Sequence, residues 1–119
     1  MDRNEREAIV VATRQMLEEL IAANGLCKDD VAMAYFSTTV DLNAEFPAVA
    51  ARQLGWTEAA LMCGHEMDVP GSLRRCIRVT VLVNSDKQQA DMVHVYLGGA
   101  AALRPDLASR RQNRGGAEQ

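Results

Sequence analysis

The chain has 119 residues, of which 48% are hydrophobic and 24% are charged, and its net charge is −3 at pH 7. This length suits one domain that folds around its own core, and the acidic balance argues against a nucleic-acid-binding surface. No apolar run approaches the roughly 20 residues of a membrane span, and the charged start, MDRNEREAIV, lacks the apolar block of a signal peptide. We therefore expect a cytoplasmic protein with neither a membrane nor a nucleic acid as its partner.

The cysteines argue against disulfide and metal chemistry. Cys27, Cys63 and Cys76 form an odd set without CxxC spacing, which favours reduced thiols. Cys63 and His65 are two residues apart and, with Cys76 and His94, would make four ligands, but neither pair has the spacing of a zinc knuckle. We expect no metal and no cofactor.

The first predicted element is an amphipathic helix over about residues 4–24. Asn4 and Glu7 resemble a helix start, and Gly25 supplies the expected stop. Side chains at helical spacing define one buried face: Ile9, Thr13, Met16, Leu17, Leu20 and Ile21. The charged residues of this segment then face water.

Two strands and a short helix are expected next. Residues 31–38 mix aliphatic and aromatic side chains without a helical period, which is typical of a strand. Phe46 precedes a proline and is pushed out of the helical region, while Pro47 suits the first position of a short helix that runs to residue 53 or 54. Residues 59–63 form a second predicted strand, followed by a loop with a Pro-Gly turn signal.

The elements near the end of the chain are shorter. Residues 85–92 suit a single helical turn, residues 93–96 a strand, and residues 100–103 a last extended piece. The polar residues 108–119 predict a disordered tail. One domain then spans residues 1–107.

The run from residue 76 to residue 83 has the length and β-branched content of a buried strand, yet Arg78 lies in its middle. Alternation puts Arg78 on one face and only apolar side chains on the other, which we expect to pack on the long helix. Removing a guanidinium from water costs several kcal/mol unless an anion and hydrogen bonds replace its hydration. Arg78 therefore predicts a partner, either Glu66 or an anionic ligand.

Other side chains are candidates for a site around Arg78. Cys63 alone is more often a small core residue than a nucleophile, and nothing in the sequence places a histidine base beside it. Tyr96 in a VHVYL strand is usually a core or interface residue. The candidate set is Arg52, Cys63, Glu66, Arg78, Tyr96 and Arg104, with Phe46 and Leu103 as apolar neighbours.

Three stretches resemble a known family: FPAVAARQLGW (46–56), CGHEMDVPGSLRRCIRV (63–79) and HVYLGGAAALRPDL (94–107). Together they are similar to the AroH-class chorismate mutases, the small monofunctional type, in unbroken order from about Arg3 to Leu107. The resemblance implies an α+β subunit with a mixed β-sheet packed on one long amphipathic helix. It also implies a homotrimer that forms a pseudo-α/β-barrel, with an active site at each subunit interface.

The resemblance assigns roles to individual residues. Arg78 would bond the ether oxygen and one carboxylate of chorismate, and Tyr96 would help to bind a carboxylate. Glu66 and the Cys63 region would hold the ring hydroxyl, so that Glu66 no longer neutralises Arg78. The pocket would be completed by Phe46, Ala48, Leu61 and Leu103 as walls, Met62 at the rim, and Arg52 and Arg104 at the entrance.

The implied reaction is the intramolecular Claisen rearrangement of chorismate to prephenate. It needs no acid, base, nucleophile or cofactor, so the protein has only to shape and charge a pocket. That pocket must select the compact chair conformer and stabilise the negative charge that grows on the ether oxygen. A fixed arginine suits this task because it is always charged and its fork reaches two acceptors.

One departure from the family concerns the start of the chain. Members normally begin with a strand bearing an R-G-x-R-G-A-T-like segment, and Met1 falls just after it, so we expect an unsatisfied sheet edge. A start codon placed too late, or a truncation, would account for this. The alternative function is a catalytically weak or inactive trimeric relative that binds a small carboxylate in the same pocket.

Overall fold

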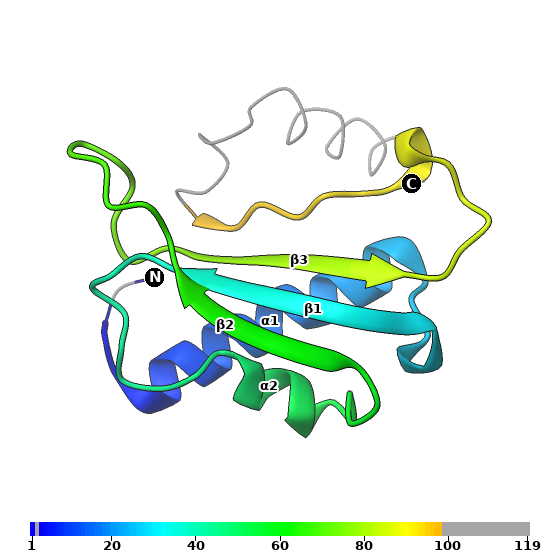
Figure 1. The fold of residues 1–119 in the computed structure, drawn as a ribbon, viewed down its shortest axis with the longest axis horizontal. Coiled ribbons are helices and arrows are strands. Elements are labelled where there is room, and N and C mark those ends of the chain that lie inside the picture. Colours follow the sequence, from blue (N-terminus) through cyan, green and yellow to red (C-terminus); the bar gives the residue numbers. More distant parts are fainter. Residues whose placement is uncertain (2, 99–119) are drawn as a thin grey trace.

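The computed structural model describes residues 1 and 3–98, which form a three-stranded sheet with two α-helices packed on one face (Figure 1). The elements in chain order are α1 (Arg6–Asn24), η1 (Lys28–Asp30), β1 (Val31–Thr38), α2 (Ala48–Gln53), β2 (Ala60–His65), β3 (Ile77–Val83) and η2 (Gln89–Asp91). The predicted long helix, first strand and short helix are confirmed. Gly25 ends α1 in the left-handed conformation, with φ at 61°, and its N–H donates to the carbonyl of Ile21.

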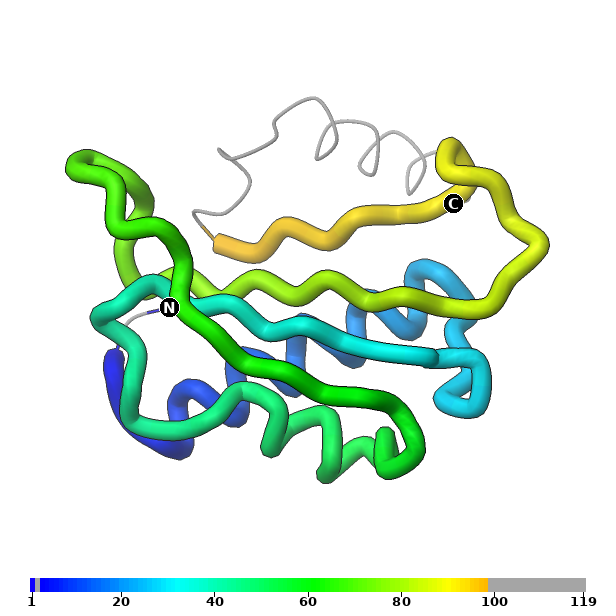
Figure 2. Tube along the Cα trace, viewed as in Figure 1, coloured from blue at the N-terminus to red at the C-terminus, as the bar shows by residue number. Residues whose placement is uncertain are grey.

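The sheet has the order β2-β1-β3, with β2 parallel and β3 antiparallel to the central strand. Thr38 at the end of β1 pairs with His65 at the end of β2 and with Ile77 at the start of β3. The loop of residues 66–76 therefore leaves and re-enters the sheet at the same end. Figure 2 shows this loop projecting beyond that end.

The core lies between the sheet and the two helices. Leu17 of α1 and Phe36 of β1 are fully buried, together with small side chains of α2 that bring this helix close to the sheet. Val79, Val81 and Val83 pack against the same cluster, which confirms the predicted apolar face of the Arg78 strand. Full burial of a side chain such as Leu17 or Phe36 stabilises the fold by about 1.5–3 kcal/mol.

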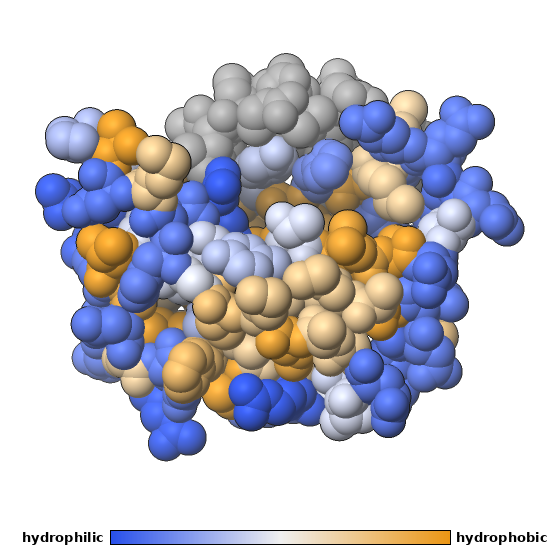
Figure 3. All heavy atoms as spheres, in the orientation of Figure 1, coloured by the Kyte–Doolittle hydropathy of each residue, from blue (hydrophilic) through white to orange (hydrophobic). Residues whose placement is uncertain are grey.

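The opposite face of the sheet is not covered by any of the described residues. Thr80 and Leu82 of β3 are exposed there, and so is Met62 of β2, which is 54% exposed. Because α1 lies behind the strands in Figure 1, Figure 3 displays this uncovered face, with apolar side chains gathered over the strands. We call it the open face.

The prediction of a strand at residues 93–96 is wrong for the described structure. Residues 92–97 run alongside β3 (Figure 1) but share no ladder with it. The side-chain amide of Asn24 holds the start of this segment, since Oδ1 accepts from the Val93 N–H and Nδ2 donates to the Val93 carbonyl, both at 2.8 Å. A cavity of about 320 Å³ is lined by β3 on one side and residues 94–97 on the other, with Met16 and Leu20 of α1. The two backbones stand apart across this cavity, so they cannot pair.

The smaller expectations have mixed outcomes. The second strand extends to His65 rather than ending at Cys63, because parallel pairing with β1 continues to the end of that strand. The single helical turn within residues 85–92 is present as the 3-10 turn η2. Residues 100–103 and the tail at 108–119 lie outside the described residues. No helix in the described part of the chain is long and apolar enough to span a membrane.

Candidate active site

Arg78 and Glu66 meet at one end of the sheet. Arg78 is the second residue of β3, and Glu66 immediately follows β2, where its N–H donates to the Thr38 carbonyl at 2.7 Å. The Nε of Arg78 donates to Oε2 of Glu66 at 3.1 Å, which makes an ion pair. The shared end of the three strands thus brings together two residues that are twelve positions apart.

One expectation about this pair is wrong, and one alternative is confirmed. The Arg78 side chain is 60% exposed rather than buried, because it lies on the open face of the sheet. Glu66 is 22% exposed and bonds to Arg78, so the alternative that Glu66 is the partner of Arg78 is confirmed, whereas its contact with a ring hydroxyl stays a prediction. The arginine retains much of its hydration, and its placement does not require a buried anion.

A hydrogen-bond network fixes the start of β3 and therefore the approach to Arg78. The Asp41 carboxylate accepts from the Thr39 hydroxyl and from the N–H of Arg75, and the Cys76 N–H donates to Thr39 Oγ1 at 3.0 Å. The Thr39 hydrogen bond is the main cause that lowers the pKa of Asp41. Arg75 has a positive φ of 47°, a conformation that a non-glycine residue adopts only when its surroundings fix it.

The cavity beside β3 collects polar groups around Arg78. Tyr96, His94 and Thr80 line it together with Arg78, over an apolar floor from α1. Arg78 and Tyr96 were predicted site residues, whereas His94 and Thr80 were not assigned to the pocket. Their signal in the sequence is the two-residue spacing from Tyr96 and Arg78, which puts them on the same side of an extended chain. The cavity offers three kinds of hydrogen-bond donor to an anionic ligand.

A second cavity, of about 310 Å³, lies at the end of β2 and is lined by Phe46, Cys63 and His65, among others. Phe46 is 65% exposed, and Cys63 is a half-buried free thiol. The Nδ1 of His65 lies 3.1 Å from Oγ1 of Thr38. Because this hydroxyl also bonds the Leu42 carbonyl at 3.2 Å, it accepts from His65.

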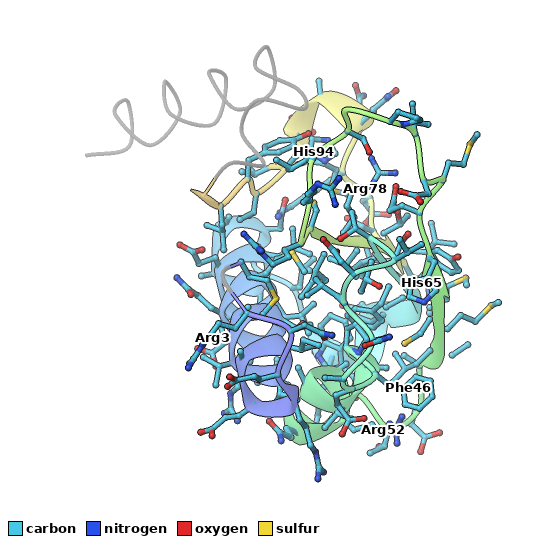
Figure 4. The ribbon with its side chains drawn as sticks, turned by 90° about the vertical axis from the view of Figure 1, so that its left-hand side faces the viewer. Arg3, Phe46, Arg52, His65, Arg78 and His94 are labelled. Atoms are coloured by element: carbon cyan, nitrogen blue, oxygen red, sulfur yellow. The ribbon has the colours of Figure 1, made fainter. Side chains whose placement is uncertain are left out.

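The remaining predicted site residues are spread over the chain. Ala48 is 3% exposed and belongs to the core, Leu61 packs against that core, and Met62 points from the open face. Arg52 is exposed on α2, and Figure 4 shows it with Phe46 at the end of the molecule away from Arg78. Leu103 and Arg104 lie outside the described residues. Within one chain, the predicted site residues therefore fall into two sets. The Arg78 group consists of Arg78, Glu66 and Tyr96, and the Phe46 group consists of Phe46 and Cys63.

In the described part of the chain, no three His, Cys, Asp or Glu side chains gather into a metal-ligand set. Cys76, which was one potential ligand, is 7% exposed and immediately precedes β3. Burial raises the pKa of the Cys76 thiol, which keeps it neutral and unreactive.

The fold and the site define an α+β domain that presents an arginine and a carboxylate at the rim of a small cavity. The sequence model of the chorismate mutase type I family matches residues 1–107. This chain belongs to that family.

Individual relatives agree with this assignment. The chorismate mutase AroH of Bacillus subtilis (strain 168) is 43% identical over 109 residues, which cover 91% of this chain and 86% of the relative. The chorismate mutase AroH of Thermus thermophilus is 47% identical over 104 residues, which cover 87% and 85%. The solved structure of a chorismate mutase from Clostridium thermocellum aligns with a TM-score of 0.83 at 50% identity, covering 85% of this chain and 90% of that one.

Proposed function

We propose that this chain is an isomerase that converts chorismate to prephenate, with Arg78 as its principal catalytic residue. The observation that carries the proposal is the Arg78 guanidinium. Its Nε is bonded to Glu66 at 3.1 Å while the side chain, 60% exposed, lines the cavity that Tyr96 also lines. A charged, hydrogen-bonded fork is thus available to an anionic substrate.

The protein forms no covalent bond to the substrate in this reaction. A C–O bond breaks and a C–C bond forms within one molecule, and no proton, nucleophile or cofactor takes part. Negative charge grows on the ether oxygen as the C–O bond breaks, and a fixed donor at that atom stabilises the transition state more than the ground state. Arg78 reaches the ether oxygen and a neighbouring carboxylate together, because its guanidinium presents parallel N–H groups.

The other candidate residues take roles in binding. Tyr96 donates to a substrate carboxylate, and Glu66 and Cys63 lie toward the ring hydroxyl. Thr80 and His94 line the Arg78 cavity and add polar contacts. Phe46, Ala48, Leu61, Met62 and Leu103 form the walls and rim, and Arg52 and Arg104 attract the dianionic substrate.

The active site lies between copies of the chain in a homotrimer. Support comes from the division of the site within one chain, where Arg78 and Tyr96 line one cavity and Phe46 and Cys63 line another. Contact between copies through the open face would bring the Arg78 group of one copy to the Phe46 group of the next. Apolar side chains on this face would then be removed from water.

We also assign residues 1–107 to one domain and residues 108–119 to a polar tail, in a cytoplasmic protein. The family match, which ends at residue 107, supports the domain boundary. All three cysteines are free thiols, which supports a reducing compartment.

The test is to incubate purified protein with chorismate, follow the loss of chorismate absorbance and identify prephenate as the product. Arg78→Ala should lower kcat/KM by more than about 100-fold, because removing one preorganised donor costs about 3 kcal/mol of transition-state stabilisation. Activity within about tenfold of the parent protein would exclude Arg78 from the mechanism. If no prephenate forms, yet chorismate raises the melting temperature, the protein is the non-catalytic binding form.

A further inference from the structure

The guanidinium of Arg78 is bonded on one edge only. Its Nε donates to Oε2 of Glu66, and among the described residues neither of its two terminal nitrogens donates a hydrogen bond. The carboxylate thus occupies the inner donor and leaves the outer nitrogens for a ligand. An arginine that faces solvent on a sheet otherwise populates several rotamers, since its long side chain has large conformational freedom.

Glu66 is itself well placed to hold the guanidinium. Its backbone is anchored by the 2.7 Å hydrogen bond from its N–H to the carbonyl of Thr38, the last residue of the central strand. Its side chain is less than half as exposed as that of Arg78, at 22% against 60%. The carboxylate is therefore the fixed member of the pair, and the arginine is the member that is held.

We propose that Glu66 is a positioning residue for Arg78. Its carboxylate locks the Nε edge of the guanidinium, so that the two terminal nitrogens are presented together to the substrate. This inference rests on the proposed function, because it assigns a second role to Glu66 beside its contact with the ring hydroxyl. It predicts that Glu66 contributes to the rate even when the substrate has no hydroxyl to bind.

The kinetic test uses Glu66→Ala and Glu66→Gln with two substrates, chorismate and an analogue in which hydrogen replaces the ring hydroxyl. Misplacing a catalytic group by about 1 Å costs up to about 100-fold in rate, so Glu66→Ala should lower kcat at least about tenfold on both substrates. Glu66→Gln should recover much of the loss on both, because its amide oxygen still accepts from Nε. A loss that is confined to chorismate would show that Glu66 acts only through the hydroxyl and would overturn the inference.

A second measurement separates this inference from the proposed activity. In the ¹⁵N spectrum of the free protein, the Nε–H signal of Arg78 should shift and exchange faster with water in Glu66→Ala. An unchanged signal would overturn the inference even in an active enzyme. If the parent protein made no prephenate, the proposed function would fail while this measurement would still test the pairing.

The chain contains a matched control pair on the surface of α1. The Nε of Arg14 donates to Oε1 of Glu18 at 2.8 Å, with side chains 47% and 55% exposed. Glu18→Ala should change the Nε–H signal of Arg14 and leave kcat and KM unaltered. A fall in kcat as large as that of Glu66→Ala would assign the effect to the loss of any surface ion pair and overturn the inference.

Discussion

The phenol of Tyr35 lies across Gly64, in the space that a Cβ atom at residue 64 would occupy. Tyr35 belongs to the central strand β1 and Gly64 to β2. The register partner of Gly64 is Ser37, which lies two residues after Tyr35 in β1. The absence of a side chain at residue 64 is therefore what allows the aromatic ring to lie against the sheet.

Gly64→Ala should destabilise the fold by about 1–3 kcal/mol, because the added methyl group forces the Tyr35 side chain out of its place. Equilibrium unfolding in urea measures this loss. Tyr35→Phe removes the hydroxyl oxygen, the atom nearest to the new methyl group, so the double variant should recover part of the stability. If Gly64→Ala and the double variant were equally stable, the clash with Tyr35 would not be the cause of the lost stability.

Asn24→Leu should cost about 2 kcal/mol of unfolding free energy, because it leaves the N–H and the carbonyl of Val93 without their partner. Amide exchange at Val93 should also become faster, and KM should rise, since this contact holds the start of the segment that carries Tyr96. Asn84→Leu is the control, because Asn84 is exposed, and it should change stability by less than about 0.5 kcal/mol. Unchanged exchange at Val93 in Asn24→Leu would contradict this account of how the segment is held.

The stability of the protein should depend on Asp41 in acid. The hydrogen bond from the Thr39 hydroxyl lowers the pKa of this carboxyl in the folded state. A carboxyl with a lowered folded pKa contributes stability above its unfolded pKa, and this contribution is lost as the pH falls through the folded pKa. Unfolding curves from about pH 6 to about pH 3 should therefore show a smaller acid loss in Asp41→Asn than in the parent protein. If the stability of Asp41→Asn and of the parent protein fell equally with pH, Asp41 would not be a source of the pH dependence of stability.

Much of the fold could be predicted because local signals and packing agree. Helical spacing of apolar side chains up to Gly25 defines α1, and β-branched alternation around Arg78 defines β3. Residues 93–96 show the limit of such patterns, since VHVY has strand character without a strand partner. A sheet ladder depends on a second backbone at the right distance, and the cavity beside β3 prevents that pairing.

The site was less predictable because it too depends on which distant segments the fold brings together. Resemblance named Arg78, Glu66 and Tyr96, and the charge of Arg78 predicted either Glu66 or an anionic ligand as its partner, but no sequence spacing could decide between the two. That contact arises because β2 and β3 flank the same end of β1. The Phe46 group lines a different cavity, and the proposed contact between copies would join the two groups.

The open face provides the sharpest test of the interfacial site. Met62 and Leu82 are 54% and 53% exposed on it, whereas Val11 is 58% exposed on α1 and serves as a control of matched exposure. Met62→Glu and Leu82→Glu should each shift the protein toward the monomer in analytical ultracentrifugation, because a charge buried between copies lacks a partner. Chorismate turnover should fall with the trimer fraction, since a monomer keeps the Arg78 and Phe46 groups apart. Val11→Glu should leave both assembly and turnover unchanged, and a fully active monomer of either open-face variant would place the whole site within one chain.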